Sequence, residues 1–587
     1  MRILGLSCFY HDAAACLIED GRIVAAVTEE AFSRKKHDSG FPKEAIRYVL
    51  AESGLNLARD GMRGVDAVVF YDKPFRKFDR SIRSHVDRFP AGLGAFVRRL
   101  PSVINHELRL GKLLKDEVDY GGPLLYSEHH LSHAASAFFC SGWDEAGVLT
   151  VDGVGEWATS SWGAGRQNSL VLEGETRFPH SLGLLYSAFT YYLGFKINSA
   201  EYKVMGLAPY GQPNYVDAIR KMVHVKDDGS FRLDMQYFDF DAGENMFTRA
   251  FEQVMGQPAR PLERPNQEVE LTQFHKDVAR SLQEVVDDTM VRLATHVVRT
   301  TGLSRLCLAG GVALNCVANG EILRRAPVDD VFVQPSAGDA GGAMGAALWA
   351  WNGLLKKPRL PRLPSVYLGP AYDDDAVQAV LDEAGARYVR LDREALLART
   401  VELLAESKVV GWFHGRFEWG PRALGHRSIL GDPRDPEMRD IINRKIKMRE
   451  GFRPFAPVVL EERVSDWFQL DRPSPYMLLV APVNPERPPL PATTHVDGSA
   501  RIQTISREQD ALYYDLVAQF GARTGVPVLI NTSMNVRGEP MVCSPLDGWR
   551  CFMRTGMDAL VIGSFVLLKE EQPAVVLKSA ADEFGLD

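Results

Sequence analysis

Short apolar runs separated by turn signals open the chain. Residues 2–6, 14–18 and 23–27 are apolar, and Asp20-Gly21 separates the last two runs. An Asp-Gly pair between two apolar runs is the strongest short signal for a β-hairpin. We therefore predict three strands here, the second and third joined by a tight turn.

The same plan returns further along the chain. The run 148–151 ends at Asp152-Gly153, a strand rich in Thr, Ser and Trp follows to Trp162, and 170–172 precede Glu173-Gly174. Two halves with one plan predict a duplicated α/β fold of the actin and sugar-kinase type, known as ASKHA. Within the second half, the pattern also predicts one long amphipathic helix and a buried strand, over 271–300 and 305–309.

A proline-rich segment, KKPRLPRLPS at 356–365, divides the chain. Prolines at a three-residue period with basic residues between them suit an extended, semi-rigid spacer. We therefore expect a first domain over 1–355 and a second over 366–587, both long enough for their own cores. A long surface loop inside one domain is the alternative.

The second domain follows an α+β pattern. Apolar runs predict its strands at 409–414, 455–460, 476–481, 526–530 and 559–567. Periodicity predicts its helices near 373–386, 393–406, 435–446 and 509–523.

Charge, cysteine content and hydropathy exclude several classes of protein. The 587 residues carry a net charge of −8, so a nucleic-acid backbone or an anionic membrane would have to meet a local basic patch. Seven scattered cysteines contain no C-x-x-C pair, which argues against a disulfide framework and a thiolate zinc site. No apolar run reaches the length of a membrane span. We expect a cytoplasmic protein with no nucleic-acid or membrane partner, and its oligomeric state stays open.

The segment HHLSHAASAFF, which begins at His129, is the first candidate site. On a helix, His129 and His133 project from one face, the spacing at which two imidazoles hold one metal ion, whereas His130 points away. Asp152 and Asp339 end or follow strands elsewhere, and two imidazoles with two carboxylates suit iron, manganese or zinc. Taken alone, the histidine pair fits a solvated or core position equally well.

Glycine-rich turns form a second candidate. In LAGGVALN a buried strand enters Gly310-Gly311 before a helix, where backbone amides can approach a nucleotide. The Asp152-Gly153 and Gly338-Asp339 turns offer two similar approaches. Each is also compatible with an ordinary strand-to-helix turn, but together the three favour nucleotide binding.

An arginine-rich segment, 415–457, is the third candidate. It holds ten basic and six acidic residues in a chain that is acidic overall. Arg416, Arg422 and Arg427 alternate with glycines and a proline, where guanidinium groups can bind an anion through paired hydrogen bonds. A phosphate site fits better than a solvated basic face or a nucleic-acid patch, because few stacking aromatics accompany the charges.

A polar strand end, LINTSMNVRGEPMV at 529–542, is the fourth. Asn531, Thr532, Ser533 and Asn535 follow an apolar run, with Arg537 behind them. Such a strand end is either a turn rich in local hydrogen bonds or one wall of a polar pocket.

These segments together resemble the O-carbamoyltransferases of antibiotic and nodulation-factor biosynthesis, and the resemblance runs from residue 1 to about 570. Its motifs are His11-Asp12, KHDSGFP from Lys36, HHLSHAASAF, VDGVGE, EYKVMGLAPYG from Glu201, LAGGVALN, AGDAGGAMGAA, GRFEWGPRALGHRSI and NTSMNVRGEPMV. The resemblance implies a first domain of the TsaD-like type and a second of the YrdC-like type. It also implies that carbamoyl phosphate and ATP form carbamoyl adenylate in the second domain, and that the first domain transfers the carbamoyl group to a hydroxyl of a small natural product.

Roles for individual residues follow from the resemblance. It implies Fe(II) held by His129, His133, Asp152 and Asp339, and Mg(II) entering with ATP. Catalytic roles then fall on His11 and His130 as candidate general bases and on Arg416, Arg422, Lys447 and Arg453. The residues implied to bind substrate or nucleotide are Lys36, Lys203, Gly310, Gly311, Asn315, Gly338, Arg427, Asn531, Ser533 and Arg537.

Two other classes compete with this interpretation. The duplicated fold alone would allow an ATP-dependent sugar kinase, which has no use for the His/Asp cluster or the arginine-rich segment. A tRNA-modification factor is the other class, and the net charge argues against it. The acceptor hydroxyl compound stays open.

Overall fold

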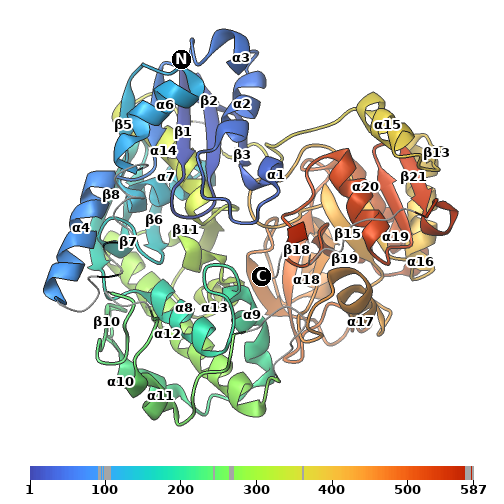
Figure 1. The fold of residues 1–587 in the computed structure, drawn as a ribbon. Helices are drawn as coiled ribbons and strands as arrows, with labels where there is room; N and C mark the ends of the chain where they lie inside the picture. Colours follow the sequence, from blue (N-terminus) through green and yellow to red (C-terminus); the bar gives the residue numbers. More distant parts are fainter. Residues whose placement is uncertain are drawn as a thin grey trace. The chain divides into compact units, whose positions relative to one another are not determined.

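The chain forms two compact units. The computed structural model describes residues 1–89, 94, 97, 107–241, 245–262, 270–359, 362–574, 583 and 584. One unit comprises Met1–Ser33 and His37–Pro364, and the other comprises Arg34–Lys36 and Ser365–Asp587. The division falls inside the proline-rich segment, while Arg34–Lys36 group with the second unit although they lie early in the chain. Figure 1 labels helices and strands of both units.

Two five-stranded sheets of identical topology form the first unit. In one sheet the order is β3-β2-β1-β4-β5, and in the other it is β8-β7-β6-β11-β12. Each sheet has three antiparallel strands followed by two parallel ones. This repeat confirms the predicted duplicated α/β fold. The strands are β1 (Arg2–Ser7), β2 (Ala14–Glu19), β3 (Arg22–Thr28), β4 (Ala67–Phe70), β5 (Leu124–Tyr126), β6 (Glu145–Val151), β7 (Ala158–Arg166), β8 (Ser169–Arg177), β11 (Arg305–Ala309) and β12 (Asp330–Val333).

One turn signal of the second half was wrong. Glu173-Gly174 does not end a strand, because β8 runs on to Arg177. Trp162 pairs with Gly174 and Gly163 with Leu172, so Glu173 is an extra residue in a β-bulge. By contrast, Asp20-Gly21 forms the predicted hairpin turn between β2 and β3.

One helix from each half of the duplicated fold packs against the other. Each of the two helices also packs on the sheet of the other half. Helix α7 (His129–Ser141) follows β5 but packs on β6 and β11, and α14 (Asp339–Leu348) follows β12 but packs on β1 and β2. Small residues permit this contact, because a Cβ at Gly345 would lie 1.8 Å from the carbonyl oxygen of Ser132 on α7. The N-termini of both helices therefore come together.

The remaining helices of this unit cover the sheets or lie between the strands. The predicted long helix is α12 (Gln273–Thr301), which packs on α13 (Cys316–Arg325) and on β6. The others are α1 (Glu30–Ser33), α2 (Lys43–Ala51), α3 (Leu57–Asp60), α4 (Pro74–Asp87), α6 (Leu110–Val118), α8 (Leu182–Tyr192), α9 (Glu201–Leu207), α10 (Val216–Met222) and α11 (Arg249–Met255), beside the small hairpin β9 (Val223–Val225) and β10 (Phe231–Leu233).

A nine-stranded mixed sheet forms the second unit. Its order is β13-β21-β20-β14-β15-β19-β16-β18-β17, and only β14–β20 and β16–β18 pair in parallel. The strands are β13 (Val389–Arg390), β14 (Val410–Phe413), β15 (Arg427–Gly431), β16 (Ala456–Leu460), β17 (Leu479–Pro482), β18 (Ser499–Ile505), β19 (Val528–Ser533), β20 (Ala559–Ile562) and β21 (Phe565–Leu568). This topology confirms the α+β fold class.

Helices cover both faces of this sheet. Apolar residues of α16 (Arg393–Ala405) and α19 (Ala511–Thr524) pack on one face with Val410 and Trp412, while α15 (Asp374–Glu383), α17 (Met438–Ile442) and α20 (Pro545–Arg554) pack on the other with Phe413. A short helix, α18 (Val464–Trp467), lies in a third cluster with β17 and β18.

Several predictions for this unit differ from the structure. The run 559–567 is two strands, β20 and β21, because Gly563 adopts a positive φ of 55° and reverses the chain. The predicted helix 435–446 is a short α-helix continued by a π-helical turn over Asn443–Lys447. Among the described elements, sequence patterns missed the strands β13, β15 and β18 and the helices α18 and α20.

The proline-rich segment is fastened to the first unit. Arg359 donates to the carbonyl oxygens of Phe138, Trp143 and Gln167, at 3.1, 3.0 and 3.2 Å, and its guanidinium lies 4.4 Å from the centroid of the Phe138 ring. The amide of Leu363 donates to Cys140. The described part of this segment is therefore a clasp on the C-terminal end of α7 rather than a free spacer.

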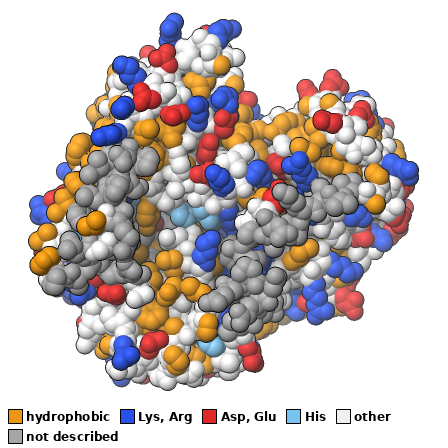
Figure 2. All heavy atoms as spheres, viewed as in Figure 1, with side chains coloured by type: hydrophobic (Ala, Val, Ile, Leu, Met, Phe, Trp, Pro, Cys, Tyr) orange, Lys and Arg blue, Asp and Glu red, His pale blue; other side chains and the backbone are white. Residues whose placement is uncertain are grey.

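Acidic and basic side chains are interspersed over the face drawn in Figure 2, and hydrophobic ones lie singly or in small groups among them. None of the helices in the described ranges combines the length and hydropathy needed to cross a bilayer.

The clasp predicts a loss of stability in Arg359→Ala. Removing the guanidinium leaves three carbonyl oxygens without this donor and removes its ring contact, so we expect the free energy of unfolding to fall by about 3 kcal/mol. Urea unfolding followed by tryptophan fluorescence measures the change. The exposed Arg362 is the control, because Arg362→Ala should stay within about 0.5 kcal/mol of the wild type. Equal urea midpoints for both variants would refute the clasp.

Candidate functional site

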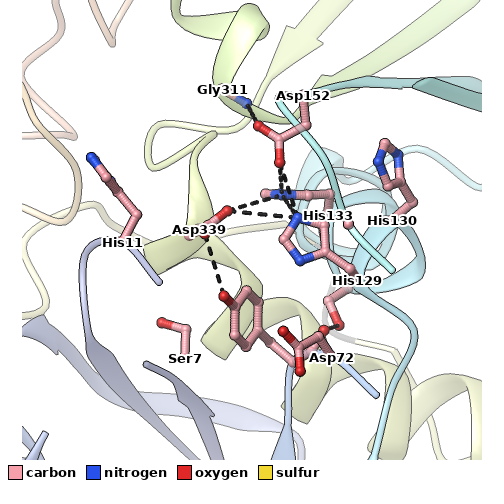
Figure 3. A network of polar contacts seen from close by, with 12 residues as sticks. Ser7, His11, Asp72, His129, His130, His133, Asp152, Gly311 and Asp339 are labelled. Atoms are coloured by element: carbon pink, nitrogen blue, oxygen red, sulfur yellow. Dashed lines mark hydrogen bonds and ion pairs between the residues drawn. The ribbon is translucent and has the colours of Figure 1, made fainter. Parts of the chain in front are cut away.

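Four ligand-type side chains converge where α7 and α14 meet. His129 opens α7 and His133 lies one turn later, Asp152 follows β6, and Asp339 opens α14. The Nε2 atoms of the two histidines are 3.1 Å apart, and Asp152 Oδ2 lies 3.0 and 3.5 Å from them. Asp339 Oδ1 is 3.6 Å from both (Figure 3). The structure thus brings together all four residues that the sequence grouped.

These separations fit ligands of one metal ion. An ion about 2.1 Å from each of two donors, at a tetrahedral or octahedral angle, holds them roughly 3.0–3.4 Å apart. Here the four donor atoms all lie within 4.8 Å of one another, and all four residues are buried. The N₂O₂ donor set suits iron, manganese or zinc. A buried His/Asp cluster able to hold a metal is therefore present.

The charges of the cluster balance one another. Burial alone would lower the pKa of His133, but hydrogen bonds and charges of Asp152 and Asp339 outweigh burial and raise that pKa to about 9. Burial would raise the pKa of Asp152, and the two imidazoles instead hold it well below its usual range. His133 and Asp152 thus stabilise each other's charged form.

Neighbouring groups hold the ligands in place from outside. The amide of Gly311 donates to Asp152 Oδ1 at 2.8 Å, and the hydroxyl of Tyr71 donates to Asp339 Oδ2 at 3.3 Å. The carboxylate of Glu156 accepts from the amide of His129 at 3.0 and 3.2 Å. Such outer contacts orient metal ligands. Sequence patterns had not singled out Tyr71, and Glu156 ends the VDGVGE motif but had no role assigned to it. The fold brings both residues into contact with the cluster.

The two predicted general bases lie in different surroundings. His130 turns away from the cluster, with Nδ1 2.7 Å from the Thr150 hydroxyl, and burial lowers its pKa to about 3 (Figure 3). For His11, burial would lower the pKa, but the hydrogen bond and charge of Asp12 raise it to about 10. Its second nitrogen donates to the carbonyl oxygen of Asn198 at 2.7 Å. In this arrangement His11 is a cation and not a free base.

The glycine motif is tied to the cluster. Gly310 has φ +90° and a Cβ there would lie 2.3 Å from the carbonyl oxygen of Val151, so only glycine fits. Its amide donates to Ala337, and the Gly311 amide donates to Asp152. The prediction that these two amides stand free for a nucleotide was therefore wrong.

Three other residues predicted to bind nucleotide have structural contacts. The Asn315 side chain accepts from the amide of Ala318 at the start of α13, and Gly338 precedes Asp339 at the start of α14. Lys203 on α9 is fully buried beside the Phe195 ring. Their part in nucleotide binding stays a prediction.

In the second unit, residues 415–427 form a loop that we call the arginine loop. Glu418, only 1% exposed, accepts the amides of Leu424, His426 and Arg427 through Oε1. Arg416 and Arg422 are half-buried.

Arg427 has a different place from the one predicted. It is fully buried, its guanidinium lies 3.7 Å from the Phe413 ring centroid, and it donates to five backbone carbonyl oxygens. Arg427 therefore holds the loop together instead of facing a ligand, which corrects its predicted role in anion binding.

A buried lysine meets the polar strand end. Lys447 Nζ donates to the carbonyl and hydroxyl oxygens of Ser533, and to the carbonyl and side-chain oxygens of Asn535 at 3.2 and 2.7 Å. Burial, together with the charge of Arg449, lowers the pKa of Lys447 well below its usual range. The structure thus joins two segments that the sequence had treated separately, and it brings Asn535 of the polar strand end into contact with Lys447.

The other predicted residues of this unit divide into two groups. Glu450 lies 3.7 Å from an Arg453 nitrogen and 3.6 Å from an Arg537 nitrogen, so the three form one charged cluster. Asn531 is fully buried and donates to Ala423 in the arginine loop and to Gln503, which makes it a structural support. Lys36 is half-buried and groups with this unit instead of the first.

Comparisons with known proteins agree along nearly the whole chain. A family model described as "Carbamoyltransferase N-terminus" matches residues 2–348, and one described as "Carbamoyltransferase C-terminus" matches residues 401–569. An uncharacterized protein of Synechocystis, sll1178, is 49% identical over 97% of both chains. Nodulation protein NolNO of Sinorhizobium fredii is 38% identical over 96% of this chain and 79% of that protein. Nodulation protein U of Rhizobium tropici is 29% identical over 92% of both.

Solved structures show distant similarity to the chain. HypF of T. kodakarensis matches 61% of this chain and 48% of its own, with 14% identity and a TM-score of 0.27. A ROK hexokinase of Thermus thermophilus matches 59% of this chain and 98% of its own, with 13% identity and a TM-score of 0.27. At such TM-scores these matches carry no argument about function.

The convergence of ligand atoms predicts metal binding that depends on His133. We expect the wild type to bind about one equivalent of a divalent transition metal and His133→Ala to lose most of it, because one of four donors is gone. Elemental analysis of the dialysed, iron-loaded proteins measures this. His130→Ala is the matched control, since His130 lies on the same helix but outside the cluster, and it should keep its metal. Full occupancy in His133→Ala would remove the ligand assignment.

Proposed function

We propose that this chain, which belongs to the carbamoyltransferase family and is a carbamoyltransferase, uses carbamoyl phosphate and ATP. In this proposal it carbamoylates a hydroxyl group of a small natural product. The proposal divides the reaction between the units. The second unit, YrdC-like, forms carbamoyl adenylate, and the first unit, TsaD-like, transfers the carbamoyl group. The observation that carries the proposal is that each unit has its own group of polar side chains. The first unit has the His/Asp cluster, and the second has the arginine loop and Lys447 with its strand-end partners.

The first half-reaction needs cations around phosphates. Water cleaves carbamoyl phosphate to carbamate and phosphate. A carbamate oxygen then attacks the α-phosphorus of ATP, and the bond to pyrophosphate breaks. Arg416 and Arg422 on the arginine loop, with Lys447 and Arg453, would bind and orient these anions. Ser533 and Arg537 would line the same site, and Mg(II) would enter with ATP.

The second half-reaction needs an activated hydroxyl. The acceptor oxygen attacks the carbamoyl carbon, and AMP leaves as the carbon–oxygen bond of the mixed anhydride breaks. A metal ion held by His129, His133, Asp152 and Asp339 would supply Lewis-acid polarisation in this unit, and the resemblance to the O-carbamoyltransferases implies Fe(II). Both ring nitrogens of His11 already bond to Asp12 and Asn198, so the ring would act on the departing phosphate through its charge and not by a hydrogen bond. His130 stays the candidate for taking the proton of the acceptor hydroxyl, and Lys203, Gly338 and Asn315 stay candidates for holding the adenylate in this unit. Lys36 groups with the second unit and stays a candidate for binding substrate there.

The competing functions find less support. A sugar kinase would have no use for the His/Asp cluster or for Lys447 and its strand-end partners. A nucleic-acid partner is disfavoured by the net charge of −8. A role in antibiotic biosynthesis and a cytoplasmic location remain predictions.

Arg416→Lys should weaken the first half-reaction. The substitution keeps the charge but replaces a planar fork with a point donor, so paired contacts to a phosphate are lost. A charge-assisted hydrogen bond contributes roughly 1.5–3 kcal/mol, which corresponds to about a ten- to hundredfold rise in KM for carbamoyl phosphate. Pyrophosphate release at varied carbamoyl phosphate measures it.

Two controls make this test specific. Arg444 is 81% exposed at its side chain, so Arg444→Lys should behave as the wild type. Carbamoyl transfer from preformed carbamoyl adenylate should be unimpaired in Arg416→Lys. Wild-type pyrophosphate release by Arg416→Lys at subsaturating carbamoyl phosphate would remove Arg416 from the site.

A further inference from the structure

A buried histidine and aspartate support the arginine loop. His426 Nδ1 lies 2.6 Å from the carbonyl oxygen of Arg416, and Nε2 lies 2.9 Å from Asp510 Oδ2. The two side chains are only 8% and 9% exposed. Asp510 is also the N-cap of α19, where its other oxygen accepts hydrogen bonds from the amides of Leu512 and Tyr513.

The two partners decide the protonation of the His426 ring. A carbonyl oxygen and a carboxylate oxygen only accept hydrogen bonds, so each ring nitrogen must donate. A ring with protons on both nitrogens carries a positive charge, and the Asp510 carboxylate neutralises it within the protein. Burial would raise the pKa of Asp510, but the hydrogen bond and charge of His426 outweigh burial and lower it.

Packing fixes the orientation of this ring. Tyr367 stacks on it with ring centroids 3.6 Å apart and an angle of 14° between the planes, and the Tyr367 hydroxyl donates to the carbonyl oxygen of Leu424. On the other side of the loop, Gly415 has φ +54°, and a Cβ there would lie 2.6 Å from His426 Cε1. The backbone that leads into Arg416 is therefore built directly against the ring.

We propose that Asp510 and His426 are positioning residues for Arg416. The imidazolium fixes the Arg416 carbonyl, and this sets the direction in which the Arg416 side chain leaves the loop. Asp510 keeps the ring charged and in place, and Glu418 holds the far end of the same loop through three amides. The inference rests on the proposed role of Arg416 as an anion-binding residue.

Two substitutions of His426 separate positioning from simple packing. In His426→Asn the amide nitrogen occupies the place of Nδ1 and still donates to Arg416, whereas in His426→Gln it occupies the place of Nε2 and donates to Asp510. We expect His426→Gln to raise KM for carbamoyl phosphate about tenfold, with kcat at saturation within about twofold of the wild type. His426→Asn should stay within about threefold for both constants. A role in packing alone would reverse this order, because Gln is closer to His in size.

Asp510→Asn tests the charge separately from the helix cap. Asn is also a good N-cap residue, so α19 should keep its start, while the ring loses its anionic partner. We expect an unchanged thermal midpoint and a rise of about threefold in the same KM. Asp392→Asn is the matched control, because Asp392 caps α16 through the amide of Ala395, and it should leave KM unchanged.

The outcomes distinguish this inference from the function on which it rests. If Arg416→Lys leaves KM for carbamoyl phosphate unchanged, the proposed role of Arg416 fails. If Arg416→Lys raises KM but His426→Gln and Asp510→Asn, folded with wild-type thermal midpoints, do not, only the positioning role is overturned.

Discussion

The close contact between α7 and α14 is the constraint on which the first unit depends. Helices approach this closely only where side chains are absent, and Gly345 against the Ser132 carbonyl provides such a place. The contact brings His129 and His133 next to Asp339, while β6 delivers Asp152. Two buried carboxylates would be strongly unfavourable alone, so the imidazoles, or a metal ion beside them, are a physical requirement of this packing.

In the second unit, buried side chains fix the position of the arginine loop through hydrogen bonds to its backbone. Arg427, Glu418 and Asn531 are buried, and each makes at least one hydrogen bond to the backbone of the arginine loop. Because these interior groups hold the loop, Arg416 and Arg422 have a defined backbone from which to reach a ligand. In both units the residues proposed for chemistry are thus oriented by buried partners that do not themselves react.

Local signals in the sequence were sufficient for much of this arrangement. Asp20-Gly21 marked a real hairpin, and the spacing of His129 and His133 placed both on one face of α7. Signals failed where tertiary contacts decide the outcome. Arg427 lies in a basic run, yet it is fully buried, because its guanidinium packs on the Phe413 ring and donates to five carbonyl oxygens.

Other contacts lay beyond local patterns altogether. Lys447 meets Ser533 and Asn535 from 86 and 88 residues away, and Tyr71 reaches Asp339 across 268 residues. No periodicity records such pairs, because the sheet order brings them together. The sequence grouped the four metal-type ligands only through their shared chemistry and their places at strand and helix ends.

His129, His133, Asp152 and Asp339 are arranged to hold one metal ion. Crystals of the iron-loaded protein, measured on both sides of the iron absorption edge, test this assignment directly. We expect one anomalous peak about 2.1 Å from both Nε2 atoms and from one oxygen of each carboxylate. A fully iron-loaded crystal with its peak elsewhere, and with the four side chains joined only to one another, would contradict the account.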